Sequence, residues 1–257
     1  MPFVDRTGVP LDGIALTELL GDTYTAGRPL FELIDGFTYA GSDGIDIDVP
    51  KHPWTFADGT SVIGSDLASV PTLLWGLVAS YGRQTMPSIL HDYECELASR
   101  MNPAEGYRAR RAADERYLVT LNESHMSWTR AQLMWAGVFV GSARKYHHPL
   151  DWATVAAWFV PLVASVVLWF SGPWWVALAV LFFGPLLGFA VPGRGRLIVV
   201  GGLGVPVVVP TLIVGVVVHV LMTIPSWVHW NVVSRRRTPR PSLTPYFLRG
   251  SDRVRPS

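Results

Sequence analysis

The hydrophobic positions of this chain follow two patterns that meet near residue 150. Lys, Arg, Asp and Glu are absent between Trp152 and Gly193, and again between Leu197 and Ser234. An ionised side chain at the centre of a bilayer costs on the order of 3 kcal/mol, so a membrane-spanning segment is depleted of charge. The pattern predicts that the second half of the chain is integral to a membrane.

The first uncharged stretch predicts a helical hairpin. Residues 152–170 and 174–191 are each long enough to span a bilayer as a helix, and a short Ser-Gly-Pro turn separates them. Amphipathic indole rings prefer the headgroup boundary. Four tryptophans lie near the ends of the two segments: Trp152, Trp169, Trp174 and Trp175.

The second uncharged stretch, residues 197–228, is too long for one upright helix and too short for two spans, and Pro206 and Pro210 interrupt it. A single crossing would place the basic tail opposite the head. A segment that enters and returns, bending near Gly204 to Pro210, would place every basic flank on one face, as the positive-inside rule favours. We expect this broken arrangement, in which a homo-oligomer would cover the non-helical backbone.

Charge divides the chain at the same place. Residues 1–150 hold 12 of the 21 Lys+Arg and 18 of the 20 acids, a net −6, whereas residues 151–257 hold 9 bases and 2 acids, a net +7. The acidic head disfavours nucleic-acid binding. The tail, residues 235–257, is rich in Arg, Pro and Ser, which predicts a disordered segment that either lies on anionic lipid headgroups or only sets topology.

The location of the head follows from the start of the sequence. Residues 1–8 carry an early acid and no continuous apolar run, so they do not resemble a secretory signal. We expect the head at the cytoplasmic face of a bacterial inner membrane. The lone Cys95 excludes an intrachain disulfide framework and a multi-cysteine zinc site.

Within residues 1–150 the periodicity predicts an α+β head. Alternating apolar and polar positions with turn residues between them predict a small antiparallel sheet. Helical spacing then replaces the alternation and predicts a helical subdomain before the transmembrane helices. The expected strands lie at 37–39, 45–49 and 54–56, and the expected helices at 70–79, 86–100, 103–121 and 127–146.

Three polar motifs interrupt the pattern of the head: Ser65-Asp66-Leu67-Ala68-Ser69-Val70-Pro71, His91-Asp92-Tyr93, and Arg110-Arg111-Ala112-Ala113-Asp114. Their order and spacing over about residues 35–145 resemble a family of phage and prophage proteins, domain of unknown function 1353. The chain departs from that pattern at Thr72, where the family often has Arg. The resemblance implies a phage-type protein and supplies no activity.

The same motifs contain candidate ligands for a divalent metal ion. One imidazole and several carboxylates suit zinc, manganese or magnesium, which activate water for hydrolysis. The candidate metal ligands are Asp66, His91, Asp92 and Asp114, and of these His91 and Asp92 are the candidate catalytic residues. The alternative interpretation makes His91 a hydrogen-bonded core histidine, Asp66 a helix cap and Asp114 an ion-pair partner of Arg110 or Arg111. Cys95 is expected to be buried as a small apolar side chain.

Three functions remain open from the sequence. The first is a structural or interaction protein that presents the head at the cytoplasmic membrane face. The second is a membrane-tethered metal-dependent hydrolase. The third is a holin-like, lysis-associated protein, suggested by the hairpin and the proline-broken segment, although the large folded head disfavours it.

Overall fold

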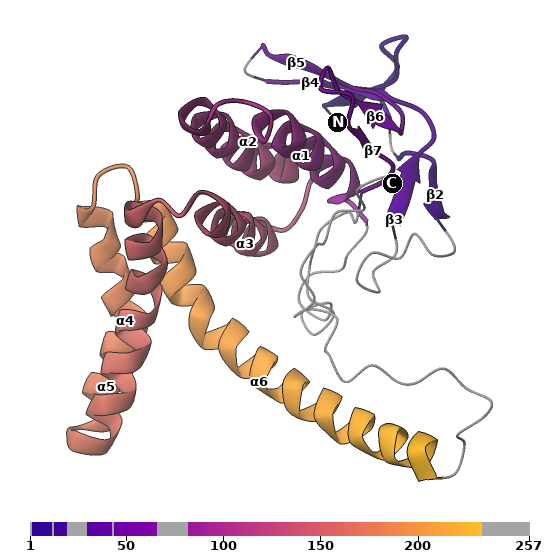
Figure 1. Cartoon of the computed structure of the whole chain (residues 1–257). Coiled ribbons are helices and arrows are strands. Elements are labelled where there is room, and N and C mark those ends of the chain that lie inside the picture. The colour runs from indigo at the N-terminus through magenta and orange to yellow at the C-terminus, as the bar shows by residue number, and fades with distance from the viewer. Residues whose placement is uncertain (1, 12, 20–29, 43, 66–81, 233–257) are drawn as a thin grey trace.

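The computed structural model describes residues 2–11, 13–19, 30–42, 44–65 and 82–232 of the 257-residue chain. Strands occupy the first part of the described chain and helices the remainder, so the fold is α+β (Figure 1). The expected helix at 70–79 lies outside the described residues. The expected order of a small antiparallel sheet followed by helices is confirmed.

The sheet region consists of one three-stranded sheet and two hairpins, all antiparallel among the described residues. The three-stranded sheet has the order β1-β4-β5, from β1 (Phe3–Val4), β4 (Phe37–Ala40) and β5 (Asp46–Val49). The hairpins pair β2 (Leu16–Leu19) with β3 (Leu30–Leu33), and β6 (Trp54–Thr55) with β7 (Ser61–Val62).

Alternation along β5 decides which face of the three-stranded sheet is buried. Asp46 and Asp48 are exposed, whereas Val49 lies opposite Phe37 and is buried with it. Gly44, with a φ of 77°, supplies the left-handed turn residue that the tight β4–β5 hairpin requires. The buried face packs on α1 (Thr85–Ala98) through Ile89 and its neighbours.

Helices α2 (Pro103–Glu123) and α3 (Trp128–Tyr146) complete the head. Asn102 starts α2 as an N-cap whose side chain accepts a hydrogen bond from the Glu105 N–H, and Pro103 occupies the first helical position, where a missing N–H has no cost. Helix α3 ends at Tyr146, and its C-cap residue His147 has the left-handed conformation. The expected bounds of these three helices agree with the structure to within a few residues.

The apolar half begins with α4 (Pro149–Ser171), which turns back into α5 (Trp174–Phe183). The two helices lie side by side, and Ser165 Oγ donates a hydrogen bond of 2.7 Å to the Ala177 carbonyl between them (Figure 1). The expected helical hairpin is therefore present. Two stretches, Pro149–Ser171 and Gly195–Val218, are long and apolar enough to cross a membrane by length and composition.

The return arm of this hairpin differs from the expectation of one helix over 174–191. The α-helix stops at Phe183 and continues as a 3-10 helix, η3 (Gly184–Ala190). Pro185 explains the change, because it donates no N–H and its ring clashes with the carbonyl four residues earlier. The tighter 3-10 winding rises further per residue, so η3 lengthens the arm without adding residues.

The expected bend near Gly204 to Pro210 is wrong. Helix α6 (Gly195–Val232) runs uninterrupted for 38 residues through Pro206 and Pro210. The two prolines are four residues apart and so lie on one face, where they disturb the same side of the helix. The flanking residues are apolar, and an unpaired backbone group among apolar side chains is costly, so hydrogen bonding within the helix favours continuity over a break.

The hydrophobic core crosses the boundary expected at residue 150. Trp135 and Phe139 of α3 share one buried cluster with Trp158 of α4 and Leu197 of α6. Gly201 permits this packing, since a Cβ there would lie 2.1 Å from the Trp158 ring. The head therefore rests directly on the first turns of the apolar helices.

Candidate functional site

The structure places three of the four candidate metal ligands. His91 and Asp92 lie on α1 and Asp114 on α2, while Asp66 lies outside the described residues. Helix α1 packs along α2 because Gly106 lets the Ala98 carbonyl approach, where a Cβ would lie only 2.6 Å from that oxygen. This close approach brings His91 to Asp114.

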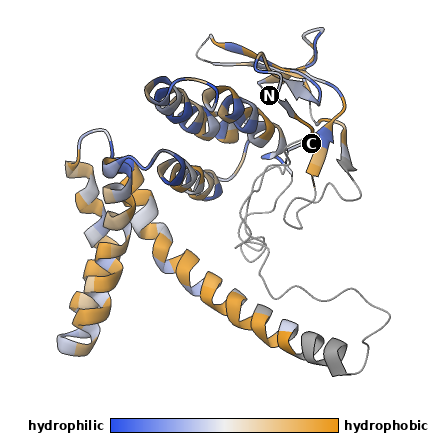
Figure 2. Ribbon diagram, viewed as in Figure 1, coloured by the Kyte–Doolittle hydropathy of each residue, from blue (hydrophilic) through white to orange (hydrophobic). Residues whose placement is uncertain are grey.

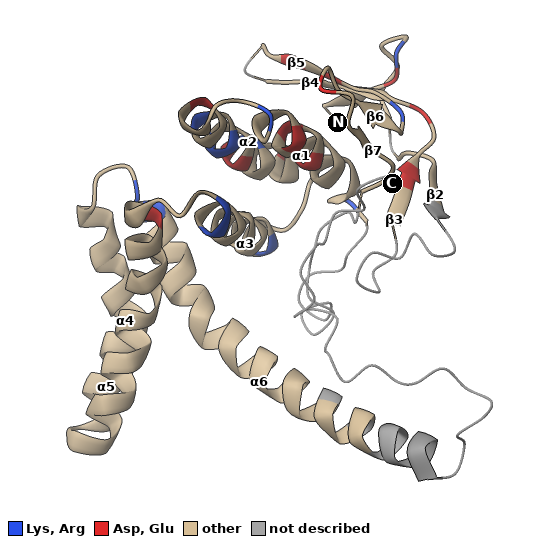
Figure 3. Ribbon diagram, viewed as in Figure 1, with Lys and Arg blue, Asp and Glu red and all other residues tan. Residues whose placement is uncertain are grey.

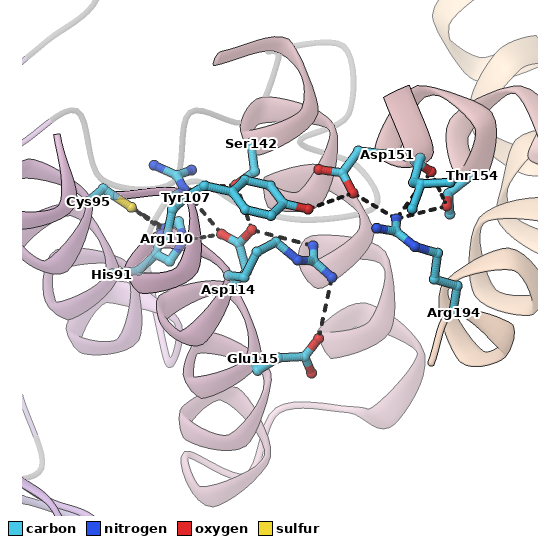
Figure 4. A network of polar contacts seen from close by, with 12 residues as sticks. His91, Cys95, Tyr107, Arg110, Asp114, Glu115, Ser142, Asp151, Thr154 and Arg194 are labelled. Carbon is cyan, nitrogen blue, oxygen red and sulfur yellow. Dashed lines mark hydrogen bonds and ion pairs between the residues drawn. The ribbon is translucent and has the colours of Figure 1, made fainter. Parts of the chain in front are cut away.

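His91 and Asp114 form a buried contact. His91 Nε2 lies 2.9 Å from Asp114 Oδ1, and both residues are nearly or wholly inaccessible to solvent (Figure 4). Ser142 of α3 donates a hydrogen bond of 2.5 Å to Asp114 Oδ2, and Arg110 Nε lies 3.2 Å from Oδ1. Arg111 NH1 is 3.9 Å from Oδ2. The carboxylate of Asp114 therefore joins all three head helices.

Burial sets the protonation of this contact. Desolvation lowers the pKa of His91, and the hydrogen bond to Asp114 opposes that shift only in part. His91 is therefore neutral at neutral pH and donates its Nε2–H to the carboxylate, an arrangement that satisfies both groups. The ion pair of Asp114 with Arg110 confirms the interpretation of Asp114 as an arginine partner.

Cys95 lies beside the same imidazole. Its Sγ is 3.6 Å from His91 Nε2, one helical turn along α1. Burial raises the pKa of the Cys95 thiol, which keeps it protonated and poorly nucleophilic. Its expected burial is confirmed.

Asp92 has a different neighbour. Ser65 Oγ donates a hydrogen bond of 2.5 Å to Asp92 Oδ2, and the backbone of Ser65 bridges to Phe31 of β3. Asp92 thus ties α1 to the sheet region. Within the described part of the chain, no group of three or more His, Cys, Asp or Glu residues is placed to hold a metal ion. A site completed by Asp66 stays a prediction.

A second polar cluster, which the motif search missed, lies where the head meets the apolar helices. Arg194, just before α6, donates hydrogen bonds to Asp151 Oδ1 at 2.7 Å and to Thr154 Oγ1 at 3.1 Å. Tyr107 of α2 donates to the same Asp151 oxygen at 3.1 Å (Figure 4). Asp151, in the first turn of α4, is fully buried.

This cluster fixes the geometry of the hairpin. Because Asp151 and Arg194 lie at its opposite ends in sequence, their contact holds the start of α4 beside the start of α6. One signal in the sequence points to it: Asp151 is the only acid between Glu123 and Asp252. A lone acid beside a long apolar segment needs a buried cationic partner.

The comparison with protein families agrees with the motifs of the head. Residues 31–138 match the model of a family described as Protein of unknown function (DUF1353). The match runs from β3 to most of α3 and contains His91, Asp92 and Asp114. The expected resemblance is thereby confirmed for this domain. No curated protein and no solved structure matches the chain.

Proposed function

We propose that the chain is a phage or prophage-type integral membrane protein that presents its α+β head at the cytoplasmic membrane face as a structural or interaction module. The exposure of large apolar side chains along α4 to α6 carries this proposal. Phe170 is 85% exposed and Leu187 78% exposed, and Figure 2 shows that hydrophobic residues predominate along these helices. Soluble monomers rarely expose contiguous apolar patches beyond a few hundred Å².

The distribution of charge supports the same proposal. Charged residues are spread through the head, whereas those described on the apolar helices lie at the head junction (Figure 3). Helix α4 is about 35 Å long at 1.5 Å per residue. The return arm reaches about 29 Å, because its 3-10 part rises about 2.0 Å per residue. Both lengths fit a hydrocarbon core of about 30 Å.

The arrangement of the helices favours three crossings. The contact of Asp151 with Arg194 supports a return arm that ends on the head side. An uninterrupted α6 then leads away from that side, so the arginine-rich tail lies on the opposite face. Four cations flank the helices on the head side, Arg144, Lys145, Arg194 and Arg196, against seven arginines in the tail, so this arrangement departs from the positive-inside rule and rests on the helix contacts.

Carbonate extraction tests membrane insertion. The full chain should stay in the pellet after alkaline washing, because stripping releases peripheral proteins and leaves spanning helices in place. A peripheral membrane protein carried through the same wash serves as the control for stripping. Recovery of the chain in the supernatant would refute the proposal.

Metal-dependent hydrolysis is the second candidate, and the buried contact between His91 and Asp114 favours it, since two candidate ligands meet there. Thermal melts of the full chain with chelator, and then with zinc, manganese or magnesium, test it. A metal site requires a stabilising shift that Asp92→Asn or His91→Ala abolishes. No bound metal and no shift with any ion would leave these residues as structural groups.

A further inference from the structure

Two arginines at the head junction have their guanidinium groups over aromatic rings of α3. The Arg111 guanidinium of α2 lies 4.6 Å from the centre of the Phe139 ring, and that of Arg196 in α6 lies 5.2 Å from the Trp135 ring. Phe139 and Trp135 are four residues apart on α3, so their rings are neighbours on one face. Each cation therefore lies over one of two neighbouring buried rings of α3.

Neither guanidinium is satisfied by a hydrogen bond. The carboxylate oxygens closest to Arg111 belong to Asp114 and Glu115 and are each 3.9 Å away, which is too long for a hydrogen bond. Within the described residues, Arg196 has no hydrogen bond or ion pair, although it is exposed. This lack matters for Arg111, whose NH1 is buried, because buried donors are normally paired, whereas the donors of the exposed Arg196 face solvent.

Within the described part of the chain, two buried nitrogen donors at the head junction also lack a hydrogen-bond acceptor. Arg111 NH1 and Trp135 Nε1 are buried without a hydrogen-bond partner among the described residues, and Trp135 is only 3% exposed. The charge of Glu115 is influenced by both arginines, whereas Asp114 is shared between Arg111, Arg110 and Ser142, and Asp151 is held by Arg194 (Figure 4). The cluster of Arg111, Glu115 and Arg196 keeps a net charge of +1.

The position of this cluster selects its ligand. Arg196 lies in the first turn of α6, beside Arg194 and the start of α4, where the head meets the apolar helices. In the proposed membrane arrangement this level coincides with the phosphates of the head-side leaflet. Basic pockets beside membrane helices on the cytoplasmic side bind anionic headgroups, and guanidinium pairs phosphate oxygens bidentately.

We propose that Arg111 and Arg196 form a binding site for the phosphate of an anionic phospholipid in the head-side leaflet. This inference rests on the proposed membrane insertion. The phosphate binds the exposed edge of Arg196 and the accessible part of Arg111, whose side chain is 21% exposed. The aromatic rings of α3 orient both guanidinium planes. They also exclude water from one side of each guanidinium, so water competes less with the phosphate for the N–H donors.

Native mass spectrometry of the full chain tests the site. The chain is purified in mixed micelles with equal amounts of phosphatidylglycerol and phosphatidylcholine, and the retained lipids are compared. We expect phosphatidylglycerol to be retained preferentially. The double variant Arg111→Gln and Arg196→Gln should lower that preference roughly thirtyfold, since each cation at an anionic surface contributes about 1 kcal/mol. Arg196→Gln alone, at an exposed position, should give a partial loss without unfolding.

Matched controls separate this site from general charge. The variant Arg108→Gln and Arg130→Gln removes the same charge from exposed head positions and should keep the preference. Arg111→Lys keeps the charge but loses the planar guanidinium, which can bind a phosphate through two N–H groups at once. This variant should therefore bind phosphatidylglycerol more weakly. Equal retention of both lipids by a carbonate-resistant chain would overturn the site and leave membrane insertion standing. Displacement of the lipid by millimolar inorganic phosphate would overturn the assignment to a lipid headgroup.

Discussion

At the residue scale, the head depends on a buried carboxylate. Asp114 is 0% exposed and receives contacts from all three head helices. Spacing in the sequence indicates its pairing with Arg110, four residues earlier on the same helix. The sequence does not indicate the hydrogen bond from Ser142 to Asp114. That contact depends on how α3 packs against α2, and no periodicity within one helix predicts such packing.

Asp114→Asn should destabilise the head by about 3–5 kcal/mol, because it leaves the mostly buried charge of Arg110 without a counter-ion. Chemical denaturation of the full chain in detergent, followed by far-UV circular dichroism, measures the loss. Glu105→Gln, at an exposed position on the same helix, should cost no more than about 1 kcal/mol. Equal effects of the two variants would contradict this role of Asp114.

Titration of His52 makes the stability of the head depend on pH. Its Nδ1 accepts a hydrogen bond of 2.8 Å from the Leu33 N–H, and its ring stacks on Trp54. Burial lowers the pKa of His52 to about 4 from 6.5. The unfolded chain therefore binds more protons between these values, so stability is full above pH 6.5 and falls as the pH drops toward 4.

The contribution of His52 to that loss is on the order of 3 kcal/mol. His52→Asn keeps an acceptor near Nδ1 and removes the titrating group, so denaturation midpoints should fall less steeply with acid. Part of the slope remains, because the lowered pKa of His91 acts in the same direction. His125→Asn, at an exposed position, is the control. An unchanged slope in His52→Asn would refute the assignment.

At the scale of elements, the sequence predicted the bounds of α1, α2, α3 and α4 to within a few residues, because helical periodicity, the Asn102 cap and the Ser-Gly-Pro turn mark them. It failed along 197–228, where Pro206 and Pro210 suggested a break and the structure has one helix. Local proline preference weighs less in a long apolar segment, where each backbone group that leaves the helix loses a hydrogen bond that its apolar neighbours cannot replace.

The close packing of α6 on α4 gives a prediction for its glycines. Gly201→Ala places a methyl group where the Trp158 ring lies, so we expect a loss of about 1–3 kcal/mol from overpacking. Gly137→Ala in α3 meets nothing within 4 Å, so this control should be neutral or stabilise the helix by up to about 1 kcal/mol. Thermal unfolding of both variants measures the difference, and similar midpoints would argue against the packing of Trp158 on Gly201.

At the scale of the whole molecule, the sequence placed a boundary at residue 150, and the structure instead carries one core across it. Periodicity shows which face of a helix is apolar but gives no information on its partner. Trp135 and Phe139 lie in the helix expected for the head at 127–146, yet they share a buried cluster with Trp158 and Leu197. The contact of Asp151 with Arg194 escaped the sequence for the same reason, since it joins residues far apart in the chain.

Cysteine accessibility in intact cells tests the central claim most directly. In a Cys95→Ser background, single cysteines are placed at Ser127 on the head, at Ser171 in the hairpin turn and at Ser234 after α6, and each is exposed to an impermeant thiol reagent. The account predicts labelling at Ser171 and Ser234 and protection at Ser127 until the cells are opened. Protection at Ser234 together with Ser127 would contradict the third crossing, and labelling at Ser127 from outside would contradict the cytoplasmic head.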